Sequence, residues 1–510
     1  MTDEFIERRI ITGLIISTEF IQEIYKLWNP KLINSATAKT LASWCIEYFE
    51  NYRKAPGRDI EGIYTEKLKQ GLQQDKAEDI EEILEGLNEE YERESFNTQY
   101  LLDQTKNHLR EQHLYQWADD IKGELDSGSV EEAEKLASGY SPLSDESLSC
   151  IDPFASATRF RQAFEDQAKP LVKFPKALGK FWNDQFTRDS FVALLGPEKR
   201  GKTFWLMEIA LRAVTSGCNV VFFQAGDMSE DQQLRRLGIY LAKRSDKEKH
   251  CKGMYVPVLD CVYNQTDQCD KDERESDFGP FDQFSVKQLY EEITADQIIE
   301  RFNSLNDYYP CRNCDKMKGV PWLKWQEPCN TLDWKTAYKY AKRFKKKYSS
   351  QFRLATYPNE TLTISEIRSV IDNMERQEGF VPDVILIDYA DILASDPDLR
   401  RMDYRQQIGK TWQRMRKLSS ERHNLVVTAT QSDADSYNVK TLGRKHFSEA
   451  KSKHAHVTAM FGLNQTEMEK KKGVMRINSL DIREDEFTVE DQVSVLQCLR
   501  MGRPYVGSYF

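Results

Sequence analysis

One segment constrains this chain more than any other: Phe191 to Thr203, with the sequence FVALLGPEKRGKT. Its two glycines, followed by Lys202 and Thr203, have the GxxxxGK[ST] spacing, in which backbone N–H groups curl around phosphates, the lysine reaches the outer phosphate oxygens and the hydroxyl can ligate Mg²⁺. An apolar run precedes this loop and a helical pattern follows it, as phosphate binding requires. We therefore predict a nucleoside-triphosphate site formed by Gly196, Pro197, Glu198, Lys199, Arg200, Gly201, Lys202 and Thr203. A chance glycine turn is the alternative.

Length and composition limit what this site can belong to. The chain has 510 residues, enough for about three domains, and no run approaches the ~18 apolar residues of a membrane span. The first residues, MTDEFIERR, lack the basic and apolar segments of a secretion signal. We therefore expect a cytoplasmic protein whose ten cysteines are thiols or metal ligands. The net charge of −10 argues against a generally basic nucleic-acid coat but leaves room for a local basic channel.

Helical patterns occupy the N-terminal region, and a polar linker with a proline follows them. Apolar residues recur at helical spacing, so that each helix is predicted to bury one face. One of these stripes consists of Ile6, Ile10 and Leu14, and another consists of Leu114, Trp117, Ile121 and Leu125. We predict a helical assembly domain over residues 1–140, a linker with its own helix over 141–178, and an α/β domain over 179–510 that an insertion interrupts at 251–334.

Two acidic side chains follow strand-like runs of this α/β domain. Asp227 comes just after the apolar run Asn219 to Phe223, where a carboxylate beside a phosphate site can hold or deprotonate the attacking water. The alternative role for Asp227 is a helix N-cap, although Ser229 can fill that position instead. Asp388 ends a wholly apolar run, the Walker B arrangement that places a carboxylate at the sheet edge to hold Mg²⁺, usually through water.

Another buried strand, Leu425 to Ala429, leads to Gln431. This amide can sense the γ-phosphate or transmit its loss to the loop that follows; a plain turn residue is the alternative. Asp391, three residues beyond Asp388, is interpreted as local structure.

The insertion is rich in cysteine. It contains one CxxC pair and a second pair of cysteines separated by seven residues. Four thiolates that bind a zinc ion would let a segment with weak hydrophobic periodicity fold. The predicted ligands of this structural zinc site are Cys261, Cys269, Cys311 and Cys314, with Cys251 and Cys329 as spare thiols. Reduced structural cysteines are the alternative.

A basic stretch follows the insertion. Lys335 to Arg353 carries eight basic residues and no acid, interleaved with aromatics. Lysines on phosphates and aromatics on bases would make it a nucleic-acid contact. The four-residue spacing of Tyr340, Phe344 and Tyr348 favours the alternative, a solvated helix with its aromatics in the core.

The order of these parts resembles the DnaB-type replicative helicases. The helical N-terminal region and linker helix are followed by the segments GPEKRGKT, FFQAGDMSEDQQLRR, DVILIDYADIL and VVTATQSD. Asp227 stands where the family has Glu. The resemblance implies a RecA-like α/β ATPase domain, with a mostly parallel sheet and helices on both faces, after an all-α domain. With its cysteine-rich insertion, the chain is more similar to phage or mobile-element relatives than to the cellular enzyme. The resemblance implies a protein that acts in the bacterial cytoplasm.

The resemblance also implies roles for particular residues. ATP with Mg²⁺ would lie between the subunits of a homohexameric ring, and single-stranded DNA would thread the channel. The late Lys-x-Arg segment of the family, which supplies an arginine finger to the neighbouring subunit, is matched in part, with Arg483 at the Arg position and Asp481 at the Lys position. The loop Ser432 to Ser448 would contact DNA through Lys440, Arg444 and Lys445, or else is an ordinary basic surface loop. A primase and a helicase loader are the expected partners.

Three classes of function follow from these predictions. The first is an ATP-driven replicative helicase that unwinds forked DNA. The second is a RecA-like DNA-dependent ATPase of recombination or regulation. The third is a ring scaffold that binds nucleotide without productive turnover, which the aspartates at positions 227 and 481 make conceivable.

Overall fold

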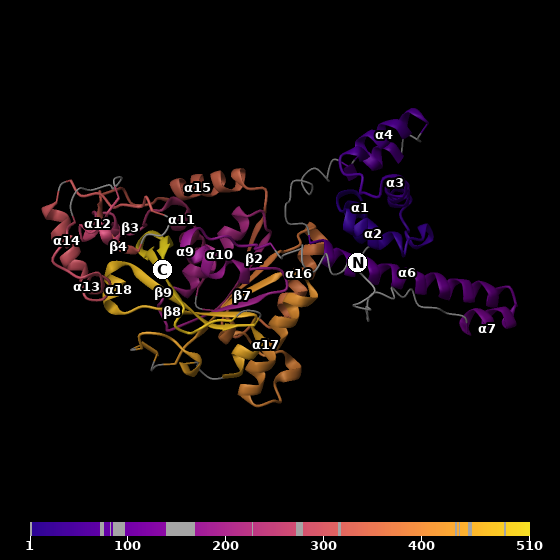
Figure 1. The fold of residues 1–510 in the computed structure, drawn as a ribbon. Helices are drawn as coiled ribbons and strands as arrows, with labels where there is room; N and C mark the ends of the chain where they lie inside the picture. Colours follow the sequence, from indigo (N-terminus) through magenta and orange to yellow (C-terminus); the bar gives the residue numbers. More distant parts are fainter. Residues whose placement is uncertain are drawn as a thin grey trace. The chain divides into compact units, whose positions relative to one another are not determined.

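The computed structural model describes residues 3–71, 76–81, 83–84, 97–138, 169–226, 228–271, 279–305, 307–314, 318–433, 436–437, 439–446, 451–483 and 486–510. They form two compact units, Met1–Gln167 and Ala168–Phe510 (Figure 1). The predicted linker helix lies outside the described residues, as does Asp227.

The described part of the first unit is helical, which confirms the predicted all-α region. Its helices are α1 (Asp3–Ile16), α2 (Thr18–Tyr25), α3 (Ala36–Tyr52), α4 (Asp59–Lys69), α6 (Thr98–Asp126) and α7 (Val130–Ser138), with a 3₁₀ turn at Pro30–Leu32. Ser17, Ser35 and Asn97 cap three of these helices by accepting a backbone N–H bond. The stripe Ile6, Ile10 and Leu14 is buried, so the periodicity of the sequence correctly marks the core.

The later stripe on α6 does not bury a face as predicted. Leu114 and Leu125 are about half exposed, at 52% and 50%, whereas Leu101, Leu102 and Leu109 are buried in the apolar core. The reason is the length of α6, a helix of 29 residues. Its first half packs against α1 and α2, and its second half has α7 as its main neighbour among the described helices.

A nine-stranded sheet forms the centre of the second unit. Its strands are β1 (Phe191–Gly196), β2 (Val220–Ala225), β5 (Phe352–Tyr357), β6 (Val384–Asp388), β7 (Leu425–Gln431), β8 (Ala459–Asn464), β9 (Val474–Ile482), β10 (Gln492–Cys498) and β11 (Arg503–Tyr509). The order is β11-β10-β9-β8-β1-β7-β6-β2-β5. In this order, β8, β1, β7, β6, β2 and β5 run parallel to one another. The pairs β8–β9, β9–β10 and β10–β11 are antiparallel. The carboxyl ends of β1, β6 and β7 therefore meet at one edge.

Helices cover both faces of this sheet, because successive strand residues point to opposite sides. On one face Val192 and Leu194 pack with α9 (Lys176–Trp182) and α10 (Lys202–Thr215). On the other face Ala193 and Leu195 pack with α16 (Ile364–Glu378) and α17 (Tyr404–Glu421). This arrangement confirms the predicted α/β fold.

The insertion folds around its own apolar core. The strands β3 (Met254–Cys261) and β4 (Gly319–Gln326) pair antiparallel, and the short helices α12 (Val262–Gln265), α13 (Val286–Glu291) and α14 (Ala295–Ser304) lie between them in the chain. Val262, Phe281, Leu289, Ile298 and Trp322 are among the buried members of that core. The elements are too short to give a clear periodicity in sequence, which explains why the sequence suggested that a metal was needed.

The structure does not support the predicted zinc site. The predicted ligands Cys261, Cys269, Cys311 and Cys314 all lie within the described residues, yet no three His, Cys, Asp or Glu side chains there come close enough to hold a metal ion. A buried carboxylate organises this region instead. Asp260 is fully buried and accepts hydrogen bonds from the backbone N–H groups of Cys261 and Cys311 and the side chains of Asn264, Gln265 and Tyr308.

We predict that Asp260→Ala destabilises the insertion while metal chelation does not. Burial raises the pKa of the Asp260 carboxyl, and its removal would leave several buried donors unpaired, at a total cost of at least about 3 kcal/mol. Hydrogen exchange of β3 and β4 measures the effect. Glu300→Ala, on the exposed side of α14, is the matched control. Rapid exchange of both strands after chelation of the wild-type protein would contradict this account.

Candidate nucleotide-binding site

The glycine loop leads directly from β1 into α10. Gly201 has a φ of 83° as the N-cap of α10, a left-handed conformation that favours glycine. Lys202 is the first residue of the helix, and its Nζ donates to the backbone oxygens of Gly196 at 2.8 Å and Pro197 at 3.1 Å. Burial lowers the pKa of Lys202 to about 8. The loop is thus closed around an ammonium group at the positive end of a helix, an arrangement that favours phosphate.

The pair predicted to hold Mg²⁺ is brought together at the same sheet edge. Asp388 ends β6 and is 2% exposed, and the Thr203 Oγ1 donates to its Oδ1 at 3.3 Å. Burial raises the pKa of Asp388 to about 6, against the opposing effects of Thr203 and Arg236. A hydroxyl and a carboxylate are hard oxygen donors of the kind that Mg²⁺ prefers, so these residues fit the ion that the sequence implies.

Gln431, at the end of β7, is held by residues of the β6 edge. Its backbone N–H donates to Asp391 Oδ2 at 2.8 Å, and its Nε2 donates to the Tyr389 hydroxyl at 3.0 Å. Asp391 also accepts from the Nζ of Lys453 at 2.7 Å, and Lys453 is completely buried. Sequence reasoning missed this lysine because it lies in a short polar stretch, Lys451–His456, with no recognisable pattern.

The helix that follows Asp227 is capped by another residue. Ser229 Oγ accepts the backbone N–H of Gln232 at 3.3 Å, and the Gln232 side chain accepts the N–H of Ser229 at 3.1 Å. This capping box begins α11 (Glu230–Ala242). The N-cap role, which was the alternative interpretation of Asp227, is therefore filled by Ser229.

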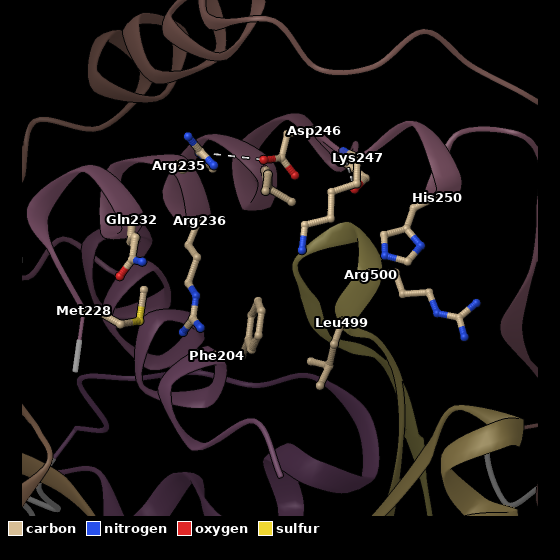
Figure 2. A pocket seen from close by; sticks show the side chains of 12 residues that line it. Phe204, Met228, Gln232, Arg235, Arg236, Asp246, Lys247, His250, Leu499 and Arg500 are labelled. Carbon is tan, nitrogen blue, oxygen red and sulfur yellow. Dashed lines mark hydrogen bonds and ion pairs between the residues drawn. The ribbon is translucent and has the colours of Figure 1, made fainter. Parts of the chain in front are cut away.

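A basic cavity of about 520 Å³ adjoins the glycine loop. It lies between the start of α10, α11 and the turn Leu499–Met501. Figure 2 shows Arg235 and Arg236 on one side and Lys247, His250 and Arg500 on the other. The Arg236 guanidinium carbon stands 4.8 Å from the ring centre of Phe204, the residue after Thr203, and Arg235 pairs with Asp246 at 3.7 Å. A ligand that enters the cavity would meet mostly cationic side chains, the single carboxylate of Asp246 and the ring of Phe204.

The late arginines occupy different environments. Arg483 is exposed just beyond β9, and its Nη2 donates to the Ala455 oxygen at 3.2 Å. Arg476 is 7% exposed and forms an ion pair with Glu469. Arg500 lines the cavity.

The loop predicted to contact DNA is described in part. Lys440 is exposed. Arg444 pairs with Asp481 at 3.3 Å and donates through Nε to the Leu480 oxygen at 3.2 Å. Lys445 belongs to the 3₁₀ turn Arg444–His446, but its side chain is outside the described part of the chain.

No described helix is long and apolar enough to cross a membrane.

No protein-family model and no curated protein matches this sequence. Two similar solved structures are described as an ATPase domain and as a DnaB-like replicative helicase with its interactions with primase. Each is 12% identical to this chain, with a TM-score of 0.43. The match to the ATPase domain covers 68% of this chain and 95% of that structure. The match to the DnaB-like helicase covers 98% of this chain and 98% of that structure.

Proposed function

We propose that this protein is an ATP-dependent replicative DNA helicase, a homohexameric ring that moves along single-stranded DNA and separates the strands at a fork. The observation that carries the proposal is the edge of the sheet where Lys202 closes the glycine loop, Thr203 contacts Asp388, and Gln431 is held beside them. Phosphate-binding, metal-holding and sensing groups are thus adjacent, which is the arrangement that ATP-driven motors require.

Each of these residues has a role in the proposed hydrolysis. Lys202 leaves the loop oxygens and binds the β- and γ-phosphates, and the cavity beside Phe204 takes the ribose and base. Thr203 and Asp388 hold Mg²⁺, which when bound neutralises phosphate charge. The Asp227 carboxylate positions the attacking water and accepts its proton.

Coupling to DNA would run through Gln431. Loss of the γ-phosphate changes what this amide contacts, and its backbone continues directly into the loop that carries Lys440, Arg444 and Lys445. Arg483 would act on ATP bound by the adjacent subunit. A head-to-tail arrangement that closes into a ring provides such a composite site. A primase and a helicase loader would be partners of the ring in a bacterial cytoplasm, including that of a phage host.

The proposal predicts that Gln431→Ala uncouples hydrolysis from DNA. Wild-type protein should hydrolyse ATP faster when single-stranded DNA is added, whereas the variant should keep a basal rate and lose the stimulation. Phosphate release with and without an oligonucleotide measures both. Gln413→Ala, an exposed position on α17, is the control. Full stimulation of the Gln431 variant would place the coupling elsewhere, and absence of hydrolysis in the wild type would favour the ring-scaffold alternative.

A further inference from the structure

The basic stretch after the insertion forms an exposed helix. It begins at Trp334 and ends at Lys347, as α15, and Asp333 caps it by accepting from the Thr336 backbone N–H at 3.0 Å. Seven of its fourteen residues are Lys or Arg and none is acidic, in a chain with a net charge of −10. Such a concentration of one charge on one element needs a physical explanation.

One side of α15 is fixed to the domain. A Cβ at Gly238 of α11 would lie 3.0 Å from the Cβ of Ala337, so glycine permits the two helices to pack closely. At the other end Phe344 and Tyr348 pack against the core beside the sheet, with ring centres 4.9 Å apart. The helix therefore packs along α11 and is held to the domain on that side (Figure 1). Two of the three aromatics that the four-residue spacing assigned to the core, Phe344 and Tyr348, thus pack against it while only partly buried, and Tyr340 is not among the core residues.

The other side of α15 carries aromatics that the core does not use. Trp334 is 74% exposed and Tyr338, one helical turn later, is 57% exposed. Lys335 lies 5.7 Å from the ring centre of Trp334, and Lys342 lies 5.0 Å from that of Tyr338. Exposed aromatic rings with adjacent ammonium groups offer both a stacking surface and a phosphate contact.

The cations of α15 have no acidic partners within the described structure. No described carboxylate lies within ion-pair distance of Lys335, Lys339, Lys342, Arg343, Lys345, Lys346 or Lys347. Like charges along about 21 Å of exposed helix repel one another mildly in water, and a bound anion would relieve this repulsion. The charge pattern thus favours a polyanion as the occupant of this face, and the exposed rings favour one with accessible bases.

We propose that the exposed face of α15 binds single-stranded nucleic acid, with Trp334 and Tyr338 stacking on bases and Lys335, Lys339 and Lys342 contacting phosphates. This contact is separate from the loop after β7, because α15 precedes the edge strand β5 and β7 lies near the centre of the sheet. Nucleic-acid binding by α15 extends the proposed function. It can be tested without strand separation, because a binding measurement alone detects it. An acidic protein segment is the competing occupant.

The test uses the full chain without nucleotide and a fluorescent oligothymidylate. Trp334→Ala with Tyr338→Ala should weaken binding at least about tenfold, as loss of base stacking does. Lys335→Glu, Lys339→Glu and Lys342→Glu together should flatten the slope of log K against log salt by about 2, because each phosphate contact on a single strand contributes ~0.7. Anisotropy titrations at several salt concentrations measure both effects.

The controls match the changes in chemistry. Tyr52→Ala with Tyr115→Ala removes two other exposed rings, at 64% and 61%, and Lys69→Glu, Lys470→Glu and Lys471→Glu reverse three other exposed lysines. Neither should change affinity comparably. Photocrosslinking to an iodouracil oligonucleotide should label the peptide containing Trp334 and Tyr338.

Three outcomes would overturn the proposal. Unchanged affinity and salt slope in folded α15 variants would show that the helix does not contact the strand. If the α15 variants still bind the oligonucleotide but no longer bind polyglutamate as the wild type does, the occupant is an acidic protein. A changed subunit mass with unchanged oligonucleotide binding would make this face a contact between copies of the chain. If the wild type binds DNA through α15 yet fails to unwind a fork, the helicase proposal fails and this one stands.

Discussion

Replacing Lys202 with alanine should reduce ATP hydrolysis at least about 10²-fold, because the variant lacks the charge that stabilises the developing negative charge on the phosphates. The fold should persist. Among the described residues, Lys202 Nζ donates only to oxygens of the glycine loop, at Gly196 and Pro197, and these oxygens can bind water once the side chain is removed. Phosphate release measures activity, and thermal unfolding measures integrity.

Lys180→Ala provides the matched control for this change. Lys180 is exposed on α9, and its alanine variant should hydrolyse ATP as the wild type does. Wild-type turnover by the Lys202 variant would remove the glycine loop from the catalytic site. A Lys202 variant that unfolds would instead show that the buried ammonium group is needed to close the loop.

Arg483→Ala should lower hydrolysis by about 10³ to 10⁵, the contribution of an arginine finger, if Arg483 acts on ATP bound by the adjacent subunit. Such a site is composite, since one subunit brings Lys202 and its neighbour brings Arg483. Homogeneous preparations of either alanine variant should be inactive. Mixed rings that place a wild-type loop beside a wild-type arginine should recover activity, and native mass spectrometry must show that subunits have mixed.

Normal hydrolysis by assembled Arg483→Ala rings would place the finger elsewhere. Arg500 would then be the next residue to test, because it lines the cavity beside the glycine loop. Arg476 is a poorer candidate, since it is buried and paired with Glu469. Failure to assemble would identify Arg483 as an interface residue.

Sequence was sufficient to predict the parts of the fold that depend on uninterrupted burial. Parallel strands covered on both faces are almost wholly apolar, so β1 and β6 were recognisable. The glycine loop after β1 pointed to Thr203, and the acidic end of β6 pointed to Asp388. The contact between those two side chains follows from the parallel order, because the carboxyl ends of such strands meet at one edge.

Long-range polar contacts leave no such pattern in the sequence. The pairing of Lys453 with Asp391 joins residues 62 positions apart, and neither belongs to a periodic segment. The same limit explains the zinc prediction, since cysteine spacing was visible in the insertion and the hydrogen bonds of Asp260 were not. On α6, periodicity predicted a buried face but carried no information on whether a partner lay beside it.

The central claim is most directly tested by strand separation on a forked DNA duplex. With ATP and Mg²⁺ present, the wild-type protein should release the labelled strand, whereas the Lys202→Ala variant, or the wild type with a non-hydrolysable ATP analogue, should not. Hydrolysis that single-stranded DNA stimulates, without any release of the labelled strand, would contradict the helicase proposal and favour a RecA-like ATPase of recombination or regulation.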